Sequence, residues 1–359
     1  MSPIPKDFKN EAYVLHALDD ARMQPYELPR KPGPQEVLLR SLSTGICGSD
    51  IHYLKEMRLG NIIITHPIVL GHEASAEVVE VGSEVTHVKP GDLVTYEPSV
   101  TCLKCEYCDN KDYNLCEYAT STCPPYTGSL TYYFVHHGKF TFKVPDHVDA
   151  EEAALVEPVC VGVHACRRGN ITVGDKVFIT GSGPIGLITL ICAKAYGATR
   201  VVLTDINEQR LQLARELGAD ETILVSKGQT EAELVKKVKA AFGGELPNKT
   251  FECSGVAVNF RLVMLTTKSA GTCVFVGMGP TEILLPVAEA ANREVDIRSC
   301  HRYKTAFPAA IELVASGKYP FKKLITHRFD FKDCAKAFDT VVSGAGVKVM
   351  IKVGEQKKQ

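Results

Sequence analysis

Four closely spaced cysteines lie in a polar stretch of the chain, at Cys102, Cys105, Cys108 and Cys116. Thiolates are strong zinc ligands, and four of them complete a tetrahedral shell at about 2.3 Å per bond. A closed shell leaves no position for a substrate, so the spacing predicts a structural zinc that stabilises a loop. Disulfides and free surface thiols are the alternatives, but a reduced compartment makes metal ligation the better explanation.

A second group of possible metal ligands is spread along the chain and consists of Cys47, the adjacent His72 and Glu73, and Glu157. Sulfur, nitrogen and oxygen donors together suit zinc, and three protein ligands plus a water leave the open position that catalysis requires. The residues by themselves leave simpler roles open. Cys47 could be a buried apolar side chain, His72 a core or turn histidine, and Glu73 a solvated acid.

A glycine-rich segment, Gly181-Ser182-Gly183-Pro184-Ile185-Gly186, directly follows an apolar strand and opens a helix. This context predicts a dinucleotide site. Gly181 permits a tight turn, Gly183 lets the backbone approach a pyrophosphate, and Gly186 allows close packing of the helix, whose N-terminus attracts the phosphates. A glycine turn without a ligand is the alternative.

An acidic residue, Asp205, ends the next strand, 19 residues beyond Gly186. Its carboxylate can accept hydrogen bonds from both ribose hydroxyls and would repel a 2′-phosphate. The sequence therefore predicts NAD rather than NADP, with Arg210 beside the adenosine.

Two successive patterns indicate which elements position these residues. Up to about Val156, short alternating apolar runs are broken by Gly and Pro, which predicts a mainly β domain. From Glu157 on, strands and helices alternate, which predicts βαβ units and a parallel sheet. Its strands are expected at 176–180, 201–205, 222–225, 250–253 and 272–276. Helices are expected at 185–195, after a capping box at Thr230 and Glu233, and at 309–316, and further strands at 324–329 and 347–353.

Length and composition limit the possible classes of protein. A chain of 359 residues predicts two domains, and 45% apolar with 23% charged residues is typical of a globular protein. Since 41 basic and 42 acidic residues nearly cancel, neither nucleic acid nor a membrane is expected as a partner. The first residues carry no apolar export segment, so a cytoplasmic location is expected.

Nearly the whole chain resembles the zinc-dependent medium-chain dehydrogenases, in particular those that oxidise polyols. The resemblance rests on Gly45-Ile46-Cys47-Gly48-Ser49-Asp50-Ile51-His52-Tyr53, Gly71-His72-Glu73, Lys89-Pro90-Gly91-Asp92, Val156-Glu157-Pro158, His164-Ala165-Cys166-Arg167-Arg168-Gly169, Arg293-Glu294-Val295-Asp296-Ile297, Arg302-Tyr303 and Thr326-His327-Arg328-Phe329. It implies an α/β protein in which a doubly wound Rossmann domain that binds NAD (158–297) is inserted into a mainly β GroES-like catalytic domain (1–157 and 298–359).

The resemblance also implies roles for individual residues. Cys47, His72 and Glu73 would ligate a catalytic zinc, which Glu157 would contact directly or through water. Ser49 and His52 would pass the proton that the alcohol loses to solvent. The substrate hydroxyls would be bound by Tyr53, Glu157, Arg302 and Tyr303. The cofactor would be bound by Gly181, Gly183, Ile185, Gly186, Asp205, Arg210, Val276, Gly277, Met278 and Arg302.

The activity that the resemblance implies is hydride transfer from a polyol to NAD, with sorbitol oxidised to fructose and xylitol also accepted. Zinc would act as a Lewis acid that makes the alkoxide accessible near neutral pH. Oxidation of L-arabinitol, xylitol or threonine is the runner-up. A zinc-free NADPH reductase, or a non-catalytic nucleotide-binding relative, is the alternative of a different class. A homotetramer is expected from the family.

Overall fold

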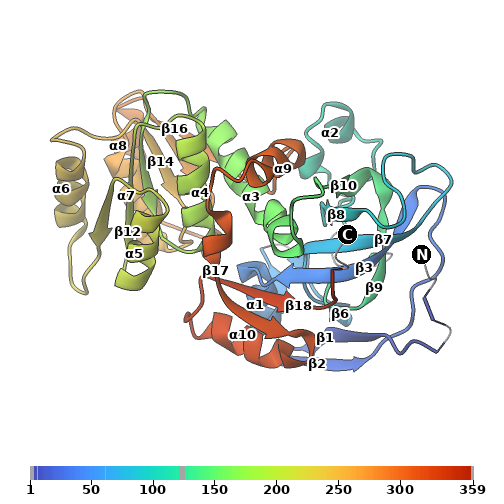
Figure 1. The fold of residues 1–359 in the computed structure, drawn as a ribbon. Coiled ribbons are helices and arrows are strands. Elements are labelled where there is room, and N and C mark those ends of the chain that lie inside the picture. Colours follow the sequence, from blue (N-terminus) through green and yellow to red (C-terminus); the bar gives the residue numbers. More distant parts are fainter. Residues whose placement is uncertain (1–3, 6, 61, 121–125, 357–359) are drawn as a thin grey trace. The chain divides into compact units, whose positions relative to one another are not determined.

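The chain folds into two compact units, each built around its own sheet (Figure 1). The structure is a computed structural model that describes residues 4–5, 7–60, 62–120 and 126–356. The first unit comprises Met1–Glu157 and Phe307–Gln359, and the second comprises Pro158–Ala306. The return to the first domain was expected at residue 298. That position lies inside strand β16 (Asp296–Ser299), which belongs to the sheet of the second unit because it pairs in parallel with the preceding strand.

The second unit is a parallel sheet whose strands are arranged in the order β13-β12-β11-β14-β15-β16. This order reverses between β11 and β14, as in doubly wound nucleotide-binding sheets. Besides β16, its strands are β11 (Lys176–Thr180), β12 (Arg200–Asp205), β13 (Glu221–Leu224), β14 (Lys249–Glu252) and β15 (Thr272–Phe275). Its helices are α4 (Pro184–Ala195), α5 (Glu208–Glu216), α6 (Glu231–Ala241), α7 (Ala257–Thr266) and α8 (Val287–Ala291). The expected parallel α/β unit is confirmed.

Local sequence signals explain where these elements begin. The strand β11 is buried along almost its whole length, as strands covered on both faces by helices are. The helix α4 starts with Pro184 at its first position, where a missing N–H costs nothing. The expected capping box of α6 is present, because Thr230 Oγ1 accepts from Glu233 N at 3.3 Å and Glu233 Oε2 accepts from Thr230 N at 2.8 Å.

The first unit is mainly β, as expected from its alternating pattern. Its strands are β1 (Glu11–Ala17), β2 (Asp20–Pro25), β3 (Glu36–Gly45), β4 (Arg58–Leu59), β5 (Ile62–Ile63), β6 (Ile68–Val69), β7 (Glu73–Val81), β8 (Leu93–Tyr96), β9 (Tyr133–His137), β10 (Thr141–Lys143), β17 (Ile325–Asp330) and β18 (Lys348–Lys352). Its helices are α1 (Gly48–Glu56), α2 (Glu106–Asp109), α9 (Phe307–Ala315) and α10 (Cys334–Val342). The main sheet runs in the order β10-β8-β7-β3-β18-β17, with β9 paired to β3.

The last strand of the chain completes the sheet of the first unit. In Figure 1, β18 (red) lies beside β3 (blue), and the two pair antiparallel, with Met350 opposite Gly45. On the other side of β3, Gly45 is opposite Glu73 of β7. One row of the sheet therefore joins three segments that are far apart in the sequence, and two of them contain predicted site residues.

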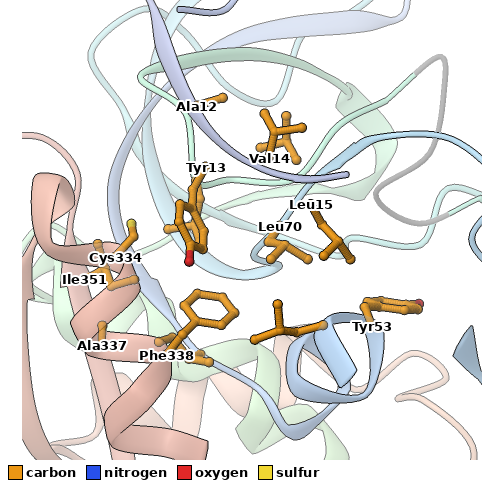
Figure 2. Packing of buried hydrophobic residues seen from close by; sticks show 14 of the residues in the cluster. Ala12, Tyr13, Val14, Leu15, Tyr53, Leu70, Cys334, Ala337, Phe338 and Ile351 are labelled. Atoms are coloured by element: carbon orange, nitrogen blue, oxygen red, sulfur yellow. The ribbon is translucent and has the colours of Figure 1, made fainter. Parts of the chain in front are cut away.

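A buried apolar cluster fixes α1 and α10 against the β1 region of the first unit (Figure 2). Tyr13 of β1 packs on Phe338 of α10 with ring centroids 5.1 Å apart. Leu54 and Tyr53 of α1 belong to the same cluster. The helix that carries the segment after Cys47 is thus anchored by apolar burial, the main stabilising term in such packing.

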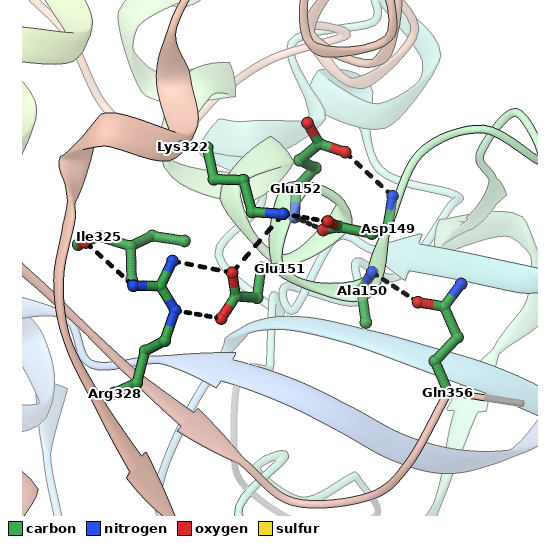
Figure 3. Close-up of polar contacts among 8 residues, drawn as sticks. All are labelled: Asp149, Ala150, Glu151, Glu152, Lys322, Ile325, Arg328 and Gln356. Atoms are coloured by element: carbon green, nitrogen blue, oxygen red, sulfur yellow. Dashed lines mark hydrogen bonds and ion pairs between the residues drawn. The ribbon is translucent and has the colours of Figure 1, made fainter. Parts of the chain in front are cut away.

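The helix α3 (Ala150–Gly169) runs without interruption through the position at which the two units divide. Its first turn is held by the C-terminal part of the chain (Figure 3). Arg328 donates two hydrogen bonds to Glu151, at 2.6 and 3.0 Å, and Gln356 Oε1 accepts from Ala150 N at 3.0 Å. Glu157 lies on the same helix, so these contacts also orient the segment that carries it.

In the part of the chain that the structure describes, no helix combines the length and apolarity needed to cross a membrane.

Candidate functional site

The four predicted zinc cysteines are gathered in the first unit, around α2 and the short 3-10 turn that follows it. Their Sγ atoms all lie within 4.8 Å of one another. Neighbouring Sγ atoms are 3.5 Å (Cys105–Cys108), 3.6 Å (Cys102–Cys116) and 3.9 Å (Cys102–Cys108) apart. A tetrahedral zinc with bonds of 2.3 Å would set these separations at about 3.8 Å, so the four thiols fit the metal closely.

The thiols of this cluster differ in how readily they ionise. Burial would raise the pKa of Cys108, but hydrogen bonding to Thr101 and Cys105 outweighs it and lowers the pKa to about 7. A thiol that ionises readily is a better metal ligand, because only the thiolate binds. Cys105 differs, because burial and hydrogen bonding to Cys108 and Cys102 raise its pKa to about 12. The donor set therefore has the geometry that a structural zinc requires and includes a thiol that ionises readily.

The second group of ligands is organised by the N-terminus of α1. Cys47 is the N-cap of this helix, and Asp50, three residues later, accepts from Cys47 N at 3.0 Å and from Gly71 N at 3.1 Å. The same carboxylate lies 3.4 Å from Nδ1 of His72. A carboxylate on one ring nitrogen is the usual partner of a metal-binding histidine, since it directs the other nitrogen towards the metal. Asp50 thus joins the cysteine segment to the histidine segment.

The free nitrogen of His72 faces a hydroxyl. Ser49 Oγ lies 3.0 Å from His72 Nε2. Burial would lower the pKa of His72, but the charge of Asp50 and then Cys47 raise it well above its ordinary value. The negative groups that favour a proton on this ring also favour a divalent cation, so the donors suit zinc.

Glu73 is held by a cation that the sequence analysis did not include. Its two carboxylate oxygens accept from Lys348 Nζ at 2.7 and 2.5 Å, and both side chains are 2% exposed. The sheet register brings them together, because Lys348 begins β18 and Glu73 begins β7, on the two sides of β3. Gly45 between them has no room for a side chain, since a Cβ would lie 2.5 Å from Glu73 Oε2.

Within the described residues, the ligand atoms of Cys47, His72, Glu73 and Glu157 are less closely gathered than the four Sγ atoms of the cysteine cluster. They nevertheless surround a common region of the first unit. Burial would lower the pKa of Lys348, but Glu73, Cys47 and Glu157 together raise it. The ammonium group of Lys348 is bound by Glu73, and Glu73 would bind zinc only if one of its oxygens left Lys348.

Ser49 and His52, the two residues predicted to transfer the proton, have different surroundings in the structure. Ser49 contacts His72, as described above, whereas His52 Nδ1 lies 3.0 Å from Glu56 Oε1 one turn further along α1. His52 is partly exposed, with 41% of its side chain accessible. The two side chains lie on the same helix, one next to the histidine and the other towards solvent.

The glycine-rich segment of the second unit forms a cradle for a phosphate group. Gly181 adopts φ +87°, and a Cβ on Gly186 would overlap Gly181 O, so both positions require glycine. A Cβ on Gly183 would meet nothing within 4 Å, which leaves open space beside the N-terminus of α4. The buried hydroxyl of Ser182 has no hydrogen-bond partner among the described residues. Open space, free donors and a helix N-terminus together fit a pyrophosphate.

Asp205 is held against the glycine-rich loop by a hydrogen bond, which also fixes the position of the loop. Its Oδ2 accepts from Ser182 N at 2.7 Å, and its Oδ1 accepts from Asn207 N at 2.9 Å. Each carboxylate oxygen keeps a lone pair for a ribose hydroxyl, because an ionised carboxylate has about four acceptor positions. Arg210 lies nearby on α5, whose N-cap is Asn207.

The remaining predicted cofactor residues lie at the ends of α4 and β15. Ile185 is in the first turn of α4. Val276 and Gly277 directly follow β15 and donate through their backbone N–H groups to Glu252 O at 2.9 and 2.8 Å. Met278 comes next and is half exposed. These residues are at the carboxyl edge of the parallel sheet, where doubly wound proteins bind their ligands.

The predicted substrate residues differ in their surroundings. Tyr53 is buried in the apolar cluster of the first unit, at the margin of the group drawn in Figure 2. Tyr303 is buried in the second unit. Arg302 adopts φ +55°, a left-handed conformation that costs a non-glycine residue free energy and often occurs at functional sites.

The sequence analysis assigned no role to Asp50, Lys348 or Glu252, although each contacts predicted site residues. Asp50 could have been found, because an acid three residues after Cys47 can complete a capping box at the start of a helix. A lysine inside the apolar run 347–353 was a weaker signal for Lys348. Its partner could not be inferred without the pairing of β18 with β3.

Comparison with known families now identifies the class of protein. The family model of the alcohol dehydrogenase GroES-like domain matches residues 33–146, and that of the zinc-binding dehydrogenase domain matches residues 184–316. The chain belongs to the zinc-dependent medium-chain dehydrogenases, with a GroES-like domain and a Rossmann-type domain, as the sequence analysis expected.

The similar sequences within this family include sorbitol dehydrogenases. The chain is 46% identical to sorbitol dehydrogenase of Gallus gallus over 346 residues, and 44% identical to that of Homo sapiens over 344 residues, with 96% of each chain covered. Among solved structures, an oxidoreductase/dehydrogenase of unknown specificity from Escherichia coli matches with a TM-score of 0.89 and 34% identity, over 97% of this chain and 100% of that one.

The two ligand sets predict a metal content that can be counted. We expect elemental analysis to find two zinc ions per chain. Cys108→Ser should remove one and lower Tm by more than about 5 °C, because a structural zinc contributes folding free energy. Cys47→Ser should remove the other with little change in Tm. Cys300→Ser, which alters a cysteine outside both sets, is the control and should keep both ions. One zinc or none in the wild type contradicts the prediction.

The Glu73–Lys348 pair predicts that zinc and Lys348 stabilise the same carboxylate. Lys348→Met leaves a buried anion without its partner, which costs about 3 to 5 kcal/mol in zinc-free protein. With zinc bound to Glu73, the loss should be clearly smaller, as measured by thermal unfolding with and without the metal. Lys352→Met on the same strand is the control, since Lys352 pairs with Glu355 at the surface and should have little effect. Equal losses in both preparations would show that Glu73 is not a zinc ligand.

Proposed function

We propose that this protein oxidises a polyol with NAD as hydride acceptor, and that sorbitol is converted to fructose at C2 and xylitol is also accepted. The observation that carries the proposal is the group Cys47–Asp50–His72, in which a carboxylate orients a histidine beside a cysteine in the manner of a metal site. The second unit supplies the nucleotide cradle, and the relatives named above are sorbitol dehydrogenases.

In this proposal, Cys47, His72, Glu73 and Glu157 hold the catalytic zinc, and Cys102, Cys105, Cys108 and Cys116 hold the structural one. A zinc ion bound at the first set would lower the pKa of the substrate hydroxyl. Ser49 would accept the proton that the substrate hydroxyl loses as its own hydroxyl proton passes to the cofactor ribose. His52, which is nearer to solvent, would pass the proton from the ribose to water.

The polyol hydroxyls that do not react need partners when they leave water. We assign this role to Tyr53, Glu157, Arg302 and Tyr303. The left-handed backbone of Arg302 supports its assignment, because a strained conformation at a charged residue is commonly associated with ligand binding.

The Asp205 carboxylate supports NAD rather than NADP as the cofactor. Its carboxylate is tied to the glycine-rich loop through Ser182 N, so it is fixed where a 2′-phosphate would meet like charge. Gly181, Gly183, Ile185 and Gly186 bind the pyrophosphate. On the nicotinamide side, Val276, Gly277, Met278 and Arg302 complete the site, and Arg210 lies beside the adenosine.

We further propose a cytoplasmic homotetramer. The strand β16 forms one edge of the sheet in the second unit, and its Ile297 is 43% exposed. An apolar side chain on an unpaired edge favours association with another chain. Sedimentation velocity should give the mass of four chains.

The cofactor assignment predicts a change of preference in one variant. Wild type should use NAD much better than NADP. Asp205→Asn removes the charge and keeps one acceptor, so the preference should narrow by on the order of 1 to 3 kcal/mol, or about 5- to 150-fold. Initial rates with both cofactors measure this ratio. Glu208→Gln, one turn of chain away at the exposed start of α5, is the control for general charge effects. A wild type that prefers NADP refutes the assignment.

The substrate assignment predicts the order of activities. Sorbitol and xylitol should exceed ethanol in kcat/KM by several orders of magnitude, because ethanol leaves the polar lining unpaired. Arg302→Ala should therefore reduce polyol turnover far more than ethanol turnover. A panel that includes L-arabinitol and threonine decides among the related activities. If threonine or ethanol exceeds every polyol, the polyol assignment is wrong, and if no alcohol is oxidised by zinc-loaded protein, the enzyme assignment is wrong as well.

A further inference from the structure

A buried carboxylate lies at the end of β14, in the middle of the sheet of the second unit. Glu252 is 0% exposed. Its Oε1 accepts from Ser254 N at 2.8 Å, from Gly255 N at 3.0 Å and from the Ser254 hydroxyl, and it lies 3.4 Å from Thr180 Oγ1. In the described chain these partners are all neutral donors, so the charge is met by hydrogen bonds alone.

This carboxylate connects three turns at the carboxyl edge of the sheet. Through Thr180 it reaches the end of β11, directly before the glycine-rich loop. Through Ser254 and Gly255 it shapes the turn between β14 and α7. Its backbone carbonyl binds the N–H groups of Val276 and Gly277 after β15.

The turns are packed so closely that they must move together. A Cβ on Gly277 would overlap Glu252 Oε2, and a Cβ on Gly255 would overlap Met278 O. A Cβ on Gly181 would lie 2.9 Å from Ser254 Cβ. A change at Glu252 would therefore displace Gly277 and its neighbours.

The place of Glu252 in the sheet decides which part of the cofactor depends on it. In the order β13-β12-β11-β14-β15-β16, the strands β11 to β13 form one mononucleotide half, and β14 to β16 form the other. Asp205 ends β12 and so marks the adenosine half. Glu252 ends β14, on the opposite side of the reversal, which is the nicotinamide half.

A carboxylate is a costly way to fill this space for packing alone. Burial raises the pKa of Glu252 even though hydrogen bonds from Ser254 and Gly255 oppose the shift. An ionised carboxylate accepts several N–H and O–H groups at once and donates none, a capacity that an amide lacks. The group is thus suited to holding several donors of neighbouring turns at one point.

We propose that Glu252 is a positioning residue for the nicotinamide half of the dinucleotide, which it serves by fixing the turn Val276-Gly277-Met278 against the glycine-rich loop. The inference rests on the proposed use of a nicotinamide cofactor. It adds a residue that would not touch the cofactor and would act through the turns described above.

The test compares two ligands that differ in the nicotinamide ring. Binding of NADH and of ADP-ribose to zinc-loaded protein is measured by calorimetry for the wild type and Glu252→Gln, an isosteric change that replaces an acceptor with a donor facing N–H groups. We expect Kd for NADH to rise about tenfold, the cost of disturbing a charged hydrogen-bond network, with ADP-ribose changed less than about twofold. Asp205→Asn is the matched variant in the other half and should weaken both ligands together.

A merely structural role gives a different result. Equal weakening of both ligands by Glu252→Gln, or a lower Tm with unchanged binding, overturns the inference. If Glu252→Gln does not fold, Ser254→Ala removes one donor of the same network and should show the same selective loss to a smaller extent; the absence of any selectivity then overturns the inference. A wild type that binds neither ligand refutes the proposed cofactor instead.

Discussion

The antiparallel pairing of β18 with β3 determines much of the first unit. It brings the last strand of the chain to the strand that leads into Cys47, with Met350 opposite Gly45. The same row continues to Glu73 on β7. Without this strand pairing, Lys348 would not be brought to Glu73. The Glu73 carboxylate would then be a buried charge without a charged partner. The metal-binding region thus depends on a contact between segments from opposite ends of the chain.

The buried carboxylates of the two units are compensated by different kinds of groups. In the first, Asp50 is balanced by backbone N–H groups and by His72, and Glu73 by Lys348. These anions lie together, which favours a divalent cation in the same region. In the second unit, the donors that the described residues offer to the Glu252 carboxylate are neutral. The charged partners of Asp50 and Glu73 lie in a region that suits a metal ion. The carboxylate of Glu252 instead accepts from several N–H groups, so it is suited to holding turns in alignment.

In the second unit, two carboxylates hold loops in place by hydrogen bonds. Asp205 and Glu252 end strands on the two sides of the reversal in the sheet, and each carboxylate receives backbone N–H groups from an adjacent loop. These hydrogen bonds within the protein fix the shape of the loops at this edge. Because the two carboxylates are separate, each half of a dinucleotide site is held by its own contacts.

Local patterns in the sequence determined a large part of this protein. The parallel strands from β11 to β15, the capping box of α6, the glycine-rich turn and the four-cysteine cluster all follow from residues close together in the chain. Such features depend on backbone conformation and short-range hydrogen bonds, which neighbouring residues specify.

The tertiary structure decided the features that depend on distant segments. The strand β16 lies at an edge where its pattern is weak, so the sequence placed the return to the first domain too early. The helix α3 continues through the expected division at residues 157 and 158, although Pro158 lies inside it. The pairs Glu73–Lys348 and Asp50–His72 require strands and helices to be assembled first, because side-chain contacts at long sequence separation follow from sheet register and helix packing rather than from spacing.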